Sequence, residues 1–250
     1  MPGKIFNIAH RGLSCKYPDN TLVAFRKAAE AGADFIELDV QTSCDGHLVV
    51  IHDTTVDRTT DGAGPVRNLT LKALQRLDAG SWFSPEFRGE RIPTLRETVD
   101  MLKETRVKLC IEVKGRDAAE AEETVARTLR LVSEHDLLER CVLTSFKPEA
   151  LSRAKALQPL VPTALDPDDK TAFTPWELCA QVLSAGANIL SLRHDYLTPE
   201  LVDEVRARGI PVWAWTVNRE EDMRRAIAAG VDAILTDDPE RLRDLLNLNR

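Results

Sequence analysis

Three segments of the chain resemble one another, and each places a glycine between a helical pattern and an apolar run. They read AGADFIELDV from Ala31, AGANILSLRHD from Ala185 and AGVDAILTDD from Ala229, with RGIPVWAWTVN from Arg208 as a looser fourth copy. A glycine just past a helix suits the left-handed C′ position, and a continuous apolar run suits a strand buried on both faces. This recurring unit predicts a parallel α/β fold.

Nine apolar runs are candidate strands, one more than an eight-stranded barrel holds: 4–10, 35–40, 48–52, 108–114, 141–146, 162–166, 188–194, 211–217 and 233–237. Only seven residues, QTSCDGH, separate the second run from the third. Parallel neighbours need a crossover of about a dozen residues, so we expect these two strands to form an antiparallel hairpin. Asp45-Gly46 is a two-residue turn signal, which predicts that residue 42 pairs with 49 and residue 39 with 52. Eight parallel strands remain.

Amphipathic stretches at helical spacing lie between the strands: 20–31, 94–105, 117–135, 148–157, 174–184, 199–207, 219–229 and 239–247. Thr94 or Thr98 and the pair Thr198-Pro199 suit helix starts. Residues 53–92 break the alternation and are dense in turn residues, so we predict an insertion there. The 250 residues are therefore expected to form one catalytic domain, a TIM-type (β/α)8 barrel with a small insertion after strand 2.

The overall composition restricts the classes of partner. A formal charge of −7 argues against a nucleic-acid binder, which would usually carry a basic patch. The five cysteines include no C-x-x-C pair, and an odd count over so long a chain does not indicate a disulfide framework. The N-terminus shows no apolar leader, and no run of 18 apolar residues occurs. We expect a cytoplasmic protein without stable membrane anchoring.

The strand at 35–40 carries two acids where a buried strand should carry none. Side chains alternate between the faces of a strand, so Glu37 and Asp39 share one face, opposite Ile36 and Leu38. Glu112 ends the next parallel strand, at the edge where barrels of this class keep their active sites. An isolated acid there more often meets solvent or a lysine, but three converging carboxylates repel unless a cation lies among them. Oxygen-only ligands favour one hard divalent cation, Mg²⁺ or Ca²⁺, with Mn²⁺ as a further candidate.

Two histidines are expected at the same level as these acids. His10 ends the first strand, and the hairpin returns His52 opposite Asp39. A lone histidine near a strand end is usually structural, whereas two of them beside an acidic metal pocket indicate a general acid and a general base. Arg11 and Lys114 add cations, whose natural complement is an anionic substrate such as a phosphate. Arg11 could instead be a structural partner of the acids.

At this point a series of motifs resembles the glycerophosphodiester phosphodiesterase family. The series runs from His10 to Pro239 and reads AHRG, P-x-N-T, GADFIELDV, T-x-x-DG-x-x-V-x-x-HD, RTT-x-G-x-G, DAGSWF, IPTL, IEVK, and TVN with GVDAILTDDP. The resemblance implies the same barrel and metal-dependent hydrolysis of small glycerophosphodiesters to an alcohol and glycerol 3-phosphate. It also implies site residues: catalytic histidines at His10 and His52, metal ligands at Glu37, Asp39 and Glu112, and phosphate contacts at Arg11 and Lys114.

One departure from the family pattern concerns position 19. The family usually has Pro-Glu-Asn-Thr where this chain has Pro18-Asp19-Asn20-Thr21, so this carboxylate is one methylene shorter. If Asp19 hydrogen-bonds a residue of the site, its reach and the geometry of the site are altered. It could also simply cap a helix starting at Asn20. Trp215, at the end of strand 7, could pack against the glycerol or the head group, or belong to the core.

Several functional alternatives stay open at this point. The nucleophile is either water or a neighbouring hydroxyl of the substrate, and neither histidine is assigned as acid or base. Lysophospholipids or a cyclic phosphodiester are alternative substrates, and a phospholipase D-like enzyme should show an exposed apolar rim. Trp82, Phe83 and Phe87 could form such a rim, but we expect these aromatic residues to form a small core under the insertion loop instead. A binding protein without catalysis should have lost a metal ligand or a histidine, and all five are present. The head group and the oligomeric state are not predicted.

Overall fold

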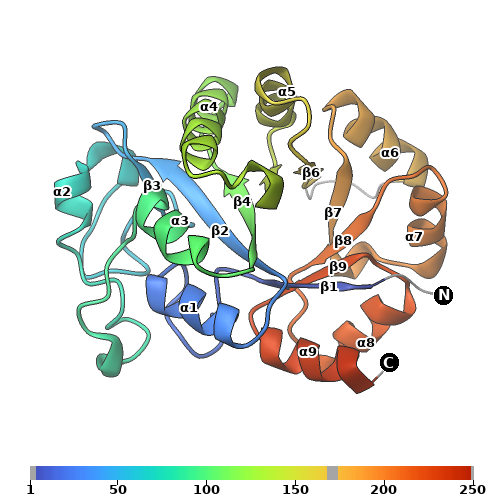
Figure 1. Cartoon of the computed structure of the whole chain (residues 1–250), viewed down its shortest axis with the longest axis horizontal. Coiled ribbons are helices and arrows are strands. Elements are labelled where there is room, and N and C mark those ends of the chain that lie inside the picture. The colour runs from blue at the N-terminus through green and yellow to red at the C-terminus, as the bar shows by residue number, and fades with distance from the viewer. Residues whose placement is uncertain (1–3, 168–173, 249–250) are drawn as a thin grey trace.

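Eight parallel strands close into a barrel in the computed structural model, which describes residues 4–167 and 174–248 (Figure 1). The neighbours run in the order β1-β9-β8-β7-β6-β5-β4-β2, and pairing of β1 with β2 completes the ring. The predicted TIM-type barrel is therefore confirmed. The strands are β1 (Phe6–Ala9), β2 (Phe35–Thr42), β4 (Lys108–Val113), β5 (Cys141–Ser145), β6 (Thr163–Leu165), β7 (Ile189–Arg193), β8 (Val212–Trp215) and β9 (Ala233–Thr236).

The ninth strand, β3 (Leu48–Val50), pairs antiparallel with β2 as predicted, but the predicted register is wrong by one residue. Thr42 lies opposite Leu48, and Ser43 N donates to His47 O. The loop therefore holds three residues and ends on Gly46, whose φ of +82° suits the left-handed position of such a loop. An Asp-Gly pair fits the end of a three-residue loop as well as a two-residue turn. Residue 39 consequently lies opposite residue 51 rather than 52.

Within the part of the chain that the structure describes, eight helices cover the outside of the barrel, and the ends of each lie within two residues of the predicted range. The Thr94 side chain caps its helix in a capping box with Glu97, and Thr198 caps the helix whose first residue is Pro199. The helices are α1 (Leu22–Glu30), α3 (Leu95–Lys103), α4 (Ala118–Glu134), α5 (Pro148–Leu157), α6 (Pro175–Ser184), α7 (Pro199–Arg206), α8 (Glu220–Ala228) and α9 (Pro239–Leu248).

The repeated glycines explain how helices α1, α6 and α8 end and connect to the strands that follow them. Gly32, Gly186 and Gly230 follow the three helix C-caps and have φ angles of +81°, +66° and +80°. L-residues with a side chain rarely adopt this left-handed conformation, so the glycine ends each helix and turns the chain into the barrel. The repeat seen in the sequence is thus a repeated helix-to-strand turn.

The hydrophobic core has an inner and an outer layer. On β2, Ile36, Leu38 and Val40 point outward and pack in the layer between barrel and helices. Phe35, on the opposite face, belongs to the interior of the barrel, and Glu37 and Asp39 follow it toward the C-terminal mouth. The barrel interior is therefore apolar at its base and acidic at its mouth. The inner cluster comprises Ile8, Phe35, Cys110, Val142, Ala164, Ile189, Trp213, Ala233 and Leu235.

The insertion after the hairpin lies beside the barrel, with α2 (Leu71–Leu74) at the left of Figure 1. It also contains two short 3-10 helices, Val66–Asn68 and Pro85–Phe87. Its core is aliphatic and is shared with β3, so the expectation of an aromatic core is wrong. Phe83 instead packs edge-on against Trp82 and Phe87 near the surface, and Trp82 is 39% exposed. The insertion core comprises Val49, Ile51, Val56, Val66, Leu74, Ala79 and Ile92.

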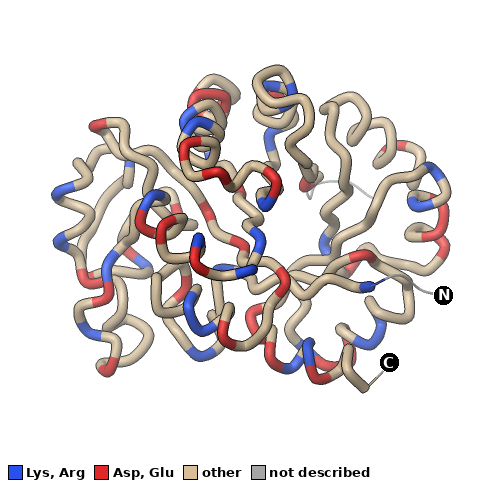
Figure 2. Tube along the Cα trace, in the orientation of Figure 1, with Lys and Arg blue, Asp and Glu red and all other residues tan. Residues whose placement is uncertain are grey.

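Charged residues of both signs are interspersed along the outer helices (Figure 2). Several form pairs one helical turn apart, such as Arg127 with Glu123 and Arg224 with Glu220. Such exposed pairs contribute little stability, but they keep the helix surfaces polar. Within the described residues, no helix combines the length and the apolar character needed to cross a membrane.

Candidate active site

The three predicted metal ligands come together at the C-terminal mouth of the barrel. Strands β2 and β4 are paired so that Asp39 lies beside Glu112 and Glu37 beside Cys110. Glu37, Asp39 and Glu112 each offer a carboxylate oxygen, and these oxygens all lie within 4.8 Å of one another. Glu37 and Asp39 are buried. The period of two along β2 and the register with β4 therefore produce the cluster expected from the sequence.

The charges of this cluster are strongly coupled. Burial raises the pKa of Glu37, and the nearby Asp39 and Glu112 raise it further. Burial also raises the pKa of Glu112 to about 8, although Lys114 opposes the shift. Burial acts in the same direction on Asp39, but Lys114 and then Arg11 outweigh it, so the Asp39 pKa lies below its usual value. Without a bound cation, the cluster therefore holds Asp39 ionised and favours protons on the two glutamates.

The donor set suits a hard divalent cation. Asp39 Oδ1 is buried and accepts no hydrogen bond of acceptable geometry from the described residues, although Lys114 Nζ lies 3.0 Å away. Lys114 also donates to Glu112, and both acids raise the Lys114 pKa against the effect of burial. All three potential ligand atoms are carboxylate oxygens, the type that Mg²⁺ and Ca²⁺ prefer. The residues present thus fit the expected cation, with Lys114 partly neutralising the cluster.

Arg11 is held at the cluster by a sharp turn after β1. Arg11 and Gly12 both have positive φ angles, +55° and +89°, and the Arg11 backbone N donates to Glu37 Oε2 at 2.8 Å. Gly12 is required here, since a Cβ would lie 2.7 Å from the Ala24 carbonyl carbon. The Arg11 guanidinium Nε lies 3.3 Å from Asp39 Oδ2. Arg11 therefore is a structural partner of the acids, and a phosphate contact remains a prediction.

The segment before α1 contacts the carboxylate cluster and the arginine beside it. Asn20 Nδ2 donates to Asp39 Oδ2 at 2.7 Å, and Thr21 caps the helix. The alternative that Asp19 caps this helix is therefore wrong. Asp19 Oδ2 instead lies 3.5 Å from Arg11 Nη1 and 3.3 Å from Arg58 Nη2, so the shorter carboxylate still reaches the arginine beside the cluster.

His10 is oriented by the carboxylate of Asp237, the residue that directly follows β9. His10 Nδ1 lies 2.6 Å from Asp237 Oδ1, and Ser14 Oγ lies 3.1 Å from the same oxygen and 2.8 Å from the His10 carbonyl oxygen, so its hydroxyl can donate to either. Asn218 Nδ2 donates to the other oxygen of Asp237. Burial would raise the Asp237 pKa, but the hydrogen bond with His10 and its neighbours lower it, so Asp237 stays ionised. With Nδ1–H turned toward Asp237, Nε2 of His10 is left for the cavity.

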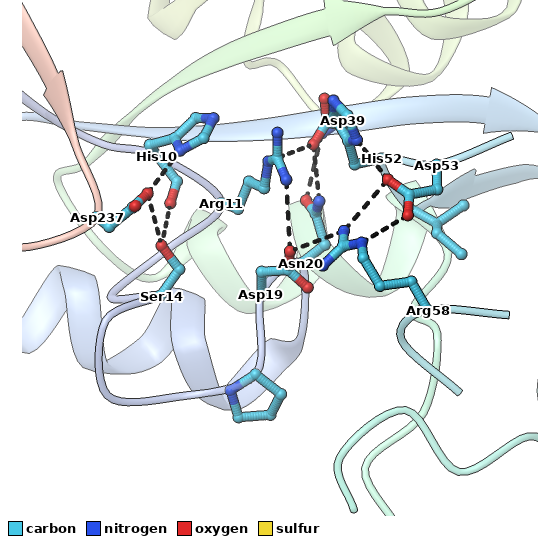
Figure 3. A network of polar contacts seen from close by, with 12 residues as sticks. His10, Arg11, Ser14, Asp19, Asn20, Asp39, His52, Asp53, Arg58 and Asp237 are labelled. Carbon is cyan, nitrogen blue, oxygen red and sulfur yellow. Dashed lines mark hydrogen bonds and ion pairs between the residues drawn. The ribbon is translucent and has the colours of Figure 1, made fainter. Parts of the chain in front are cut away.

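His52 is held in the same manner on the other side of Arg11 (Figure 3). His52 Nδ1 lies 2.7 Å from Asp53 Oδ1, and Arg58 Nε donates to Asp53 Oδ2 at 2.6 Å. The hydrogen bond from Arg58 lowers the Asp53 pKa to about 2, and burial lowers the His52 pKa. Gln41 Nε2 lies within 3.0 Å of the carbonyl oxygens of residues 51, 52 and 53, and its two N–H groups bond this backbone to β2. His52 therefore reaches the site although its predicted register is wrong.

The partners of the two histidines were not predicted. Asp53 follows His52 directly in the HD motif, and Asp237 lies in the LTDDP motif. Both residues therefore belong to recognised motifs, but neither was assigned a function. Arg58 begins the RTT motif and was likewise given no role, because its importance comes from ion pairs with Asp53 and Asp19 that local sequence does not show.

One cavity is lined by most of the predicted residues, although Asp39, Lys114 and Asp19 are not in its wall, and it has a second polar end at Asp166 and Ser191. Burial raises the pKa of Asp166 in this cavity to about 6, and the Thr144 hydroxyl donates to its carboxylate. Trp215 packs edge-on against Phe146, and its buried indole N–H has no hydrogen-bond partner among the described residues. The lining residues are His10, Arg11, Glu37, His52, Cys110, Glu112, Thr144, Phe146, Asp166, Ser191, Trp215, Thr216 and Leu235.

Comparison with known proteins identifies the family. The model of the glycerophosphoryl diester phosphodiesterase family matches residues 10–241. A glycerophosphodiester phosphodiesterase of Caldanaerobacter subterraneus is 41% identical over 245 residues, which cover 97% of this chain and 98% of the relative. A phosphodiesterase of Oleispira antarctica, solved in complex with the product sn-glycerol-3-phosphate, superimposes with a TM-score of 0.89 at 31% identity, covering 96% of each chain. The chain therefore belongs to the glycerophosphoryl diester phosphodiesterase family.

Proposed function

We propose that the protein hydrolyses glycerophosphodiesters to an alcohol and glycerol 3-phosphate with the help of one divalent cation. The observation that carries this proposal is the pair of histidines, each with Nδ1 on a carboxylate and both lining the cavity of the acidic cluster. Family membership and the similarity to an enzyme bound to glycerol 3-phosphate support it.

Glu37, Asp39 and Glu112 are the proposed ligands of the cation, Mg²⁺ or Ca²⁺, with Mn²⁺ as a further candidate. When bound, the cation would supply positive charge for the oxygens of the phosphodiester. Arg11 and Lys114, which already lie against Asp39, would bind the same phosphate from the protein side. Charge that develops on the phosphate oxygens would then be offset by groups held in place before the reaction.

The two histidines would move the protons. One imidazole Nε2 would take the proton of the nucleophile, either water or a neighbouring hydroxyl of the substrate. The other would give a proton to the leaving alkoxide, because an unprotonated alkoxide is a poor leaving group at neutral pH. Asp237 and Asp53 would fix the ring orientations and stabilise each imidazolium that forms.

The polar end of the cavity is the proposed site of the glycerol moiety. Asp166 and Ser191 offer hydrogen-bonding groups, and the indole N–H of Trp215 is without a partner among the described residues. A three-carbon polyol presents hydroxyls that can satisfy these groups, while Trp215 and Phe146 can cover its carbon chain.

Metal removal tests the proposal. Protein stripped with EDTA should release no glycerol 3-phosphate from glycerophosphodiesters, and readdition of Mg²⁺, Ca²⁺ or Mn²⁺ should restore turnover. Glu37→Gln should stay inactive at the metal concentration that restores the wild type. The control Glu134→Gln, at an exposed carboxylate of α4, should behave like the wild type. Lack of turnover with all three metals would overturn the proposal.

Two further predictions concern substrate and location. Trp82 of the insertion is partly exposed, so lysophospholipids stay an alternative substrate class. Comparing the turnover of lysophosphatidylcholine with that of glycerophosphocholine distinguishes the two substrate classes. The five cysteines are unpaired, which supports a reducing compartment such as the cytoplasm.

A further inference from the structure

A second cavity of about 360 Å³ opens beside the catalytic cavity. We call it the side cavity. It lies between the insertion, which contributes Arg67, and the segments after β4 and β5, which contribute Arg116 and Lys147. His52, Glu112 and Phe146 line both cavities, so the two cavities adjoin at these residues.

The side cavity carries more positive than negative charge. Among the described residues, neither Arg67 nor Lys147 forms an ion pair with a carboxylate, and Arg67 is exposed. Arg116 is paired with Glu120 at 2.7 Å. The remaining acid and base of the wall, Glu112 and Lys114, are paired with each other at the metal cluster. Arg67 and Lys147 are therefore left without a counterion within residues 4–167 and 174–248.

The position of the side cavity assigns it to one part of the substrate, if the proposed function holds. The phosphate would lie at the acidic cluster, and the glycerol would extend toward Asp166 and Ser191. The other substituent of the phosphodiester, the head-group alcohol, must then leave the cluster in a different direction. The side cavity begins at His52 and offers that space.

The lining of the side cavity is a poor match for a cationic head group. Quaternary ammonium groups are bound by several aromatic faces, whereas Phe146 is the aromatic residue here, beside Arg67 and Lys147. A carboxylate or phosphate on the head group would instead meet the cations of Arg67 and Lys147, and the Arg67 guanidinium can donate two parallel hydrogen bonds. Because the cavity is open to solvent, water and salt weaken the effect.

We infer that the side cavity binds the head group of the substrate and selects head groups that carry an anionic substituent over purely cationic ones. Arg67 and Lys147 are the residues that determine this specificity. The inference rests on the proposed function and adds a substrate class to it.

The test compares two substrates that differ by one carboxylate, glycerophosphoserine and glycerophosphoethanolamine. The readout is the ratio of their kcat/KM values at low salt, which does not depend on the fraction of active enzyme. We expect a ratio of at least about 10 in favour of the serine ester, with each cation contributing about three- to tenfold. The ratio should fall as salt is raised, because exposed charges are screened.

Variants assign the preference to the cavity. The double variant Arg67→Gln/Lys147→Gln should bring the ratio to about one, whereas Arg67→Lys alone should retain most of it. The matched control is Arg88→Gln, which removes an exposed charge from the same insertion outside the side cavity. Its ratio should equal that of the wild type. Neither test residue endangers folding, since Arg67 is exposed and the Lys147 side chain makes no capping hydrogen bond to α5.

Three results would overturn the inference. A wild-type ratio of about one or below would show no selection for the carboxylate. A high ratio that survives in the double variant would assign the preference to contacts of the carboxylate with the metal rather than with the side cavity. Absence of turnover for both esters and for glycerophosphoglycerol with every metal would refute the proposed function, and the inference would fall with it.

Discussion

Binding of a divalent cation should release protons from the carboxylate cluster. Ionised carboxylate oxygens of the cluster lie no more than 4.8 Å apart, so two such charges repel by at least about 3.5 kcal/mol at an effective dielectric constant near 20. The metal-free protein avoids this cost by protonation, since burial raises the pKa of Glu112 to about 8 and that of Glu37 above its usual value. A cation needs the ionised carboxylates, so binding at pH 7 should release between about one and two protons.

The sign of the pH effect follows from these shifts. Below the Glu112 pKa of about 8, the metal-free cluster is protonated and a cation competes with protons. Affinity should therefore rise with pH, by up to about tenfold per pH unit for each proton released, and should level off above the pKa of the last glutamate to ionise. The affinity should fall as the pH falls toward 6.

Isothermal titration calorimetry measures the released protons directly. Titration of Mg²⁺ or Ca²⁺ into stripped protein at pH 7, in buffers with different ionisation enthalpies, gives the number of protons per bound ion. Glu37→Gln should bind more weakly and release fewer protons, while Glu134→Gln should match the wild type. An affinity independent of pH between 6 and 8, with no proton released, would refute the reasoning.

Three further predictions address positioning and stability. Asp237→Asn should lower kcat by about two to four orders of magnitude with little change in Tm, because it removes the carboxylate that orients His10; unchanged kcat would contradict this role. Leu74→Ala should lower the free energy of unfolding by about 2–5 kcal/mol in urea titrations, because Leu74 is fully buried in the insertion core, and a loss below about 1 kcal/mol would argue against that core. Thr94→Ala should cost about 1 kcal/mol in the same assay, since it removes the capping box of α3, and no loss would show that the cap contributes nothing.

The features that the sequence predicted are those set by local patterns. The glycine that ends a helix and the apolar run that follows recur along the chain, so they indicate the barrel without knowledge of distant contacts. The alternation of side chains along β2 likewise puts Glu37 and Asp39 on one face, and parallel pairing puts Glu112 beside them. These relations depend on the geometry of single strands and adjacent strands.

Features that depend on tertiary contacts were missed or wrong. Asp237 contacts His10 across 227 residues of sequence, and nothing in the local pattern links the two. The predicted hairpin register was wrong by one residue, because Asp45-Gly46 fits both a two-residue and a three-residue loop. Gln41 then determines where His52 lies, because its side-chain N–H groups bond the backbone carbonyls of the returning segment.

The most direct test of the central claim is the release of glycerol 3-phosphate by His10→Ala and His52→Ala in the presence of saturating metal. Each histidine lines the cavity and has its Nδ1 on a carboxylate, so each replacement removes a proposed proton-transfer group while leaving the carboxylate cluster in place. The account predicts a loss of kcat of at least about 10²-fold for each variant, with Tm within a few degrees of the wild type. Near-normal turnover by either variant would contradict it.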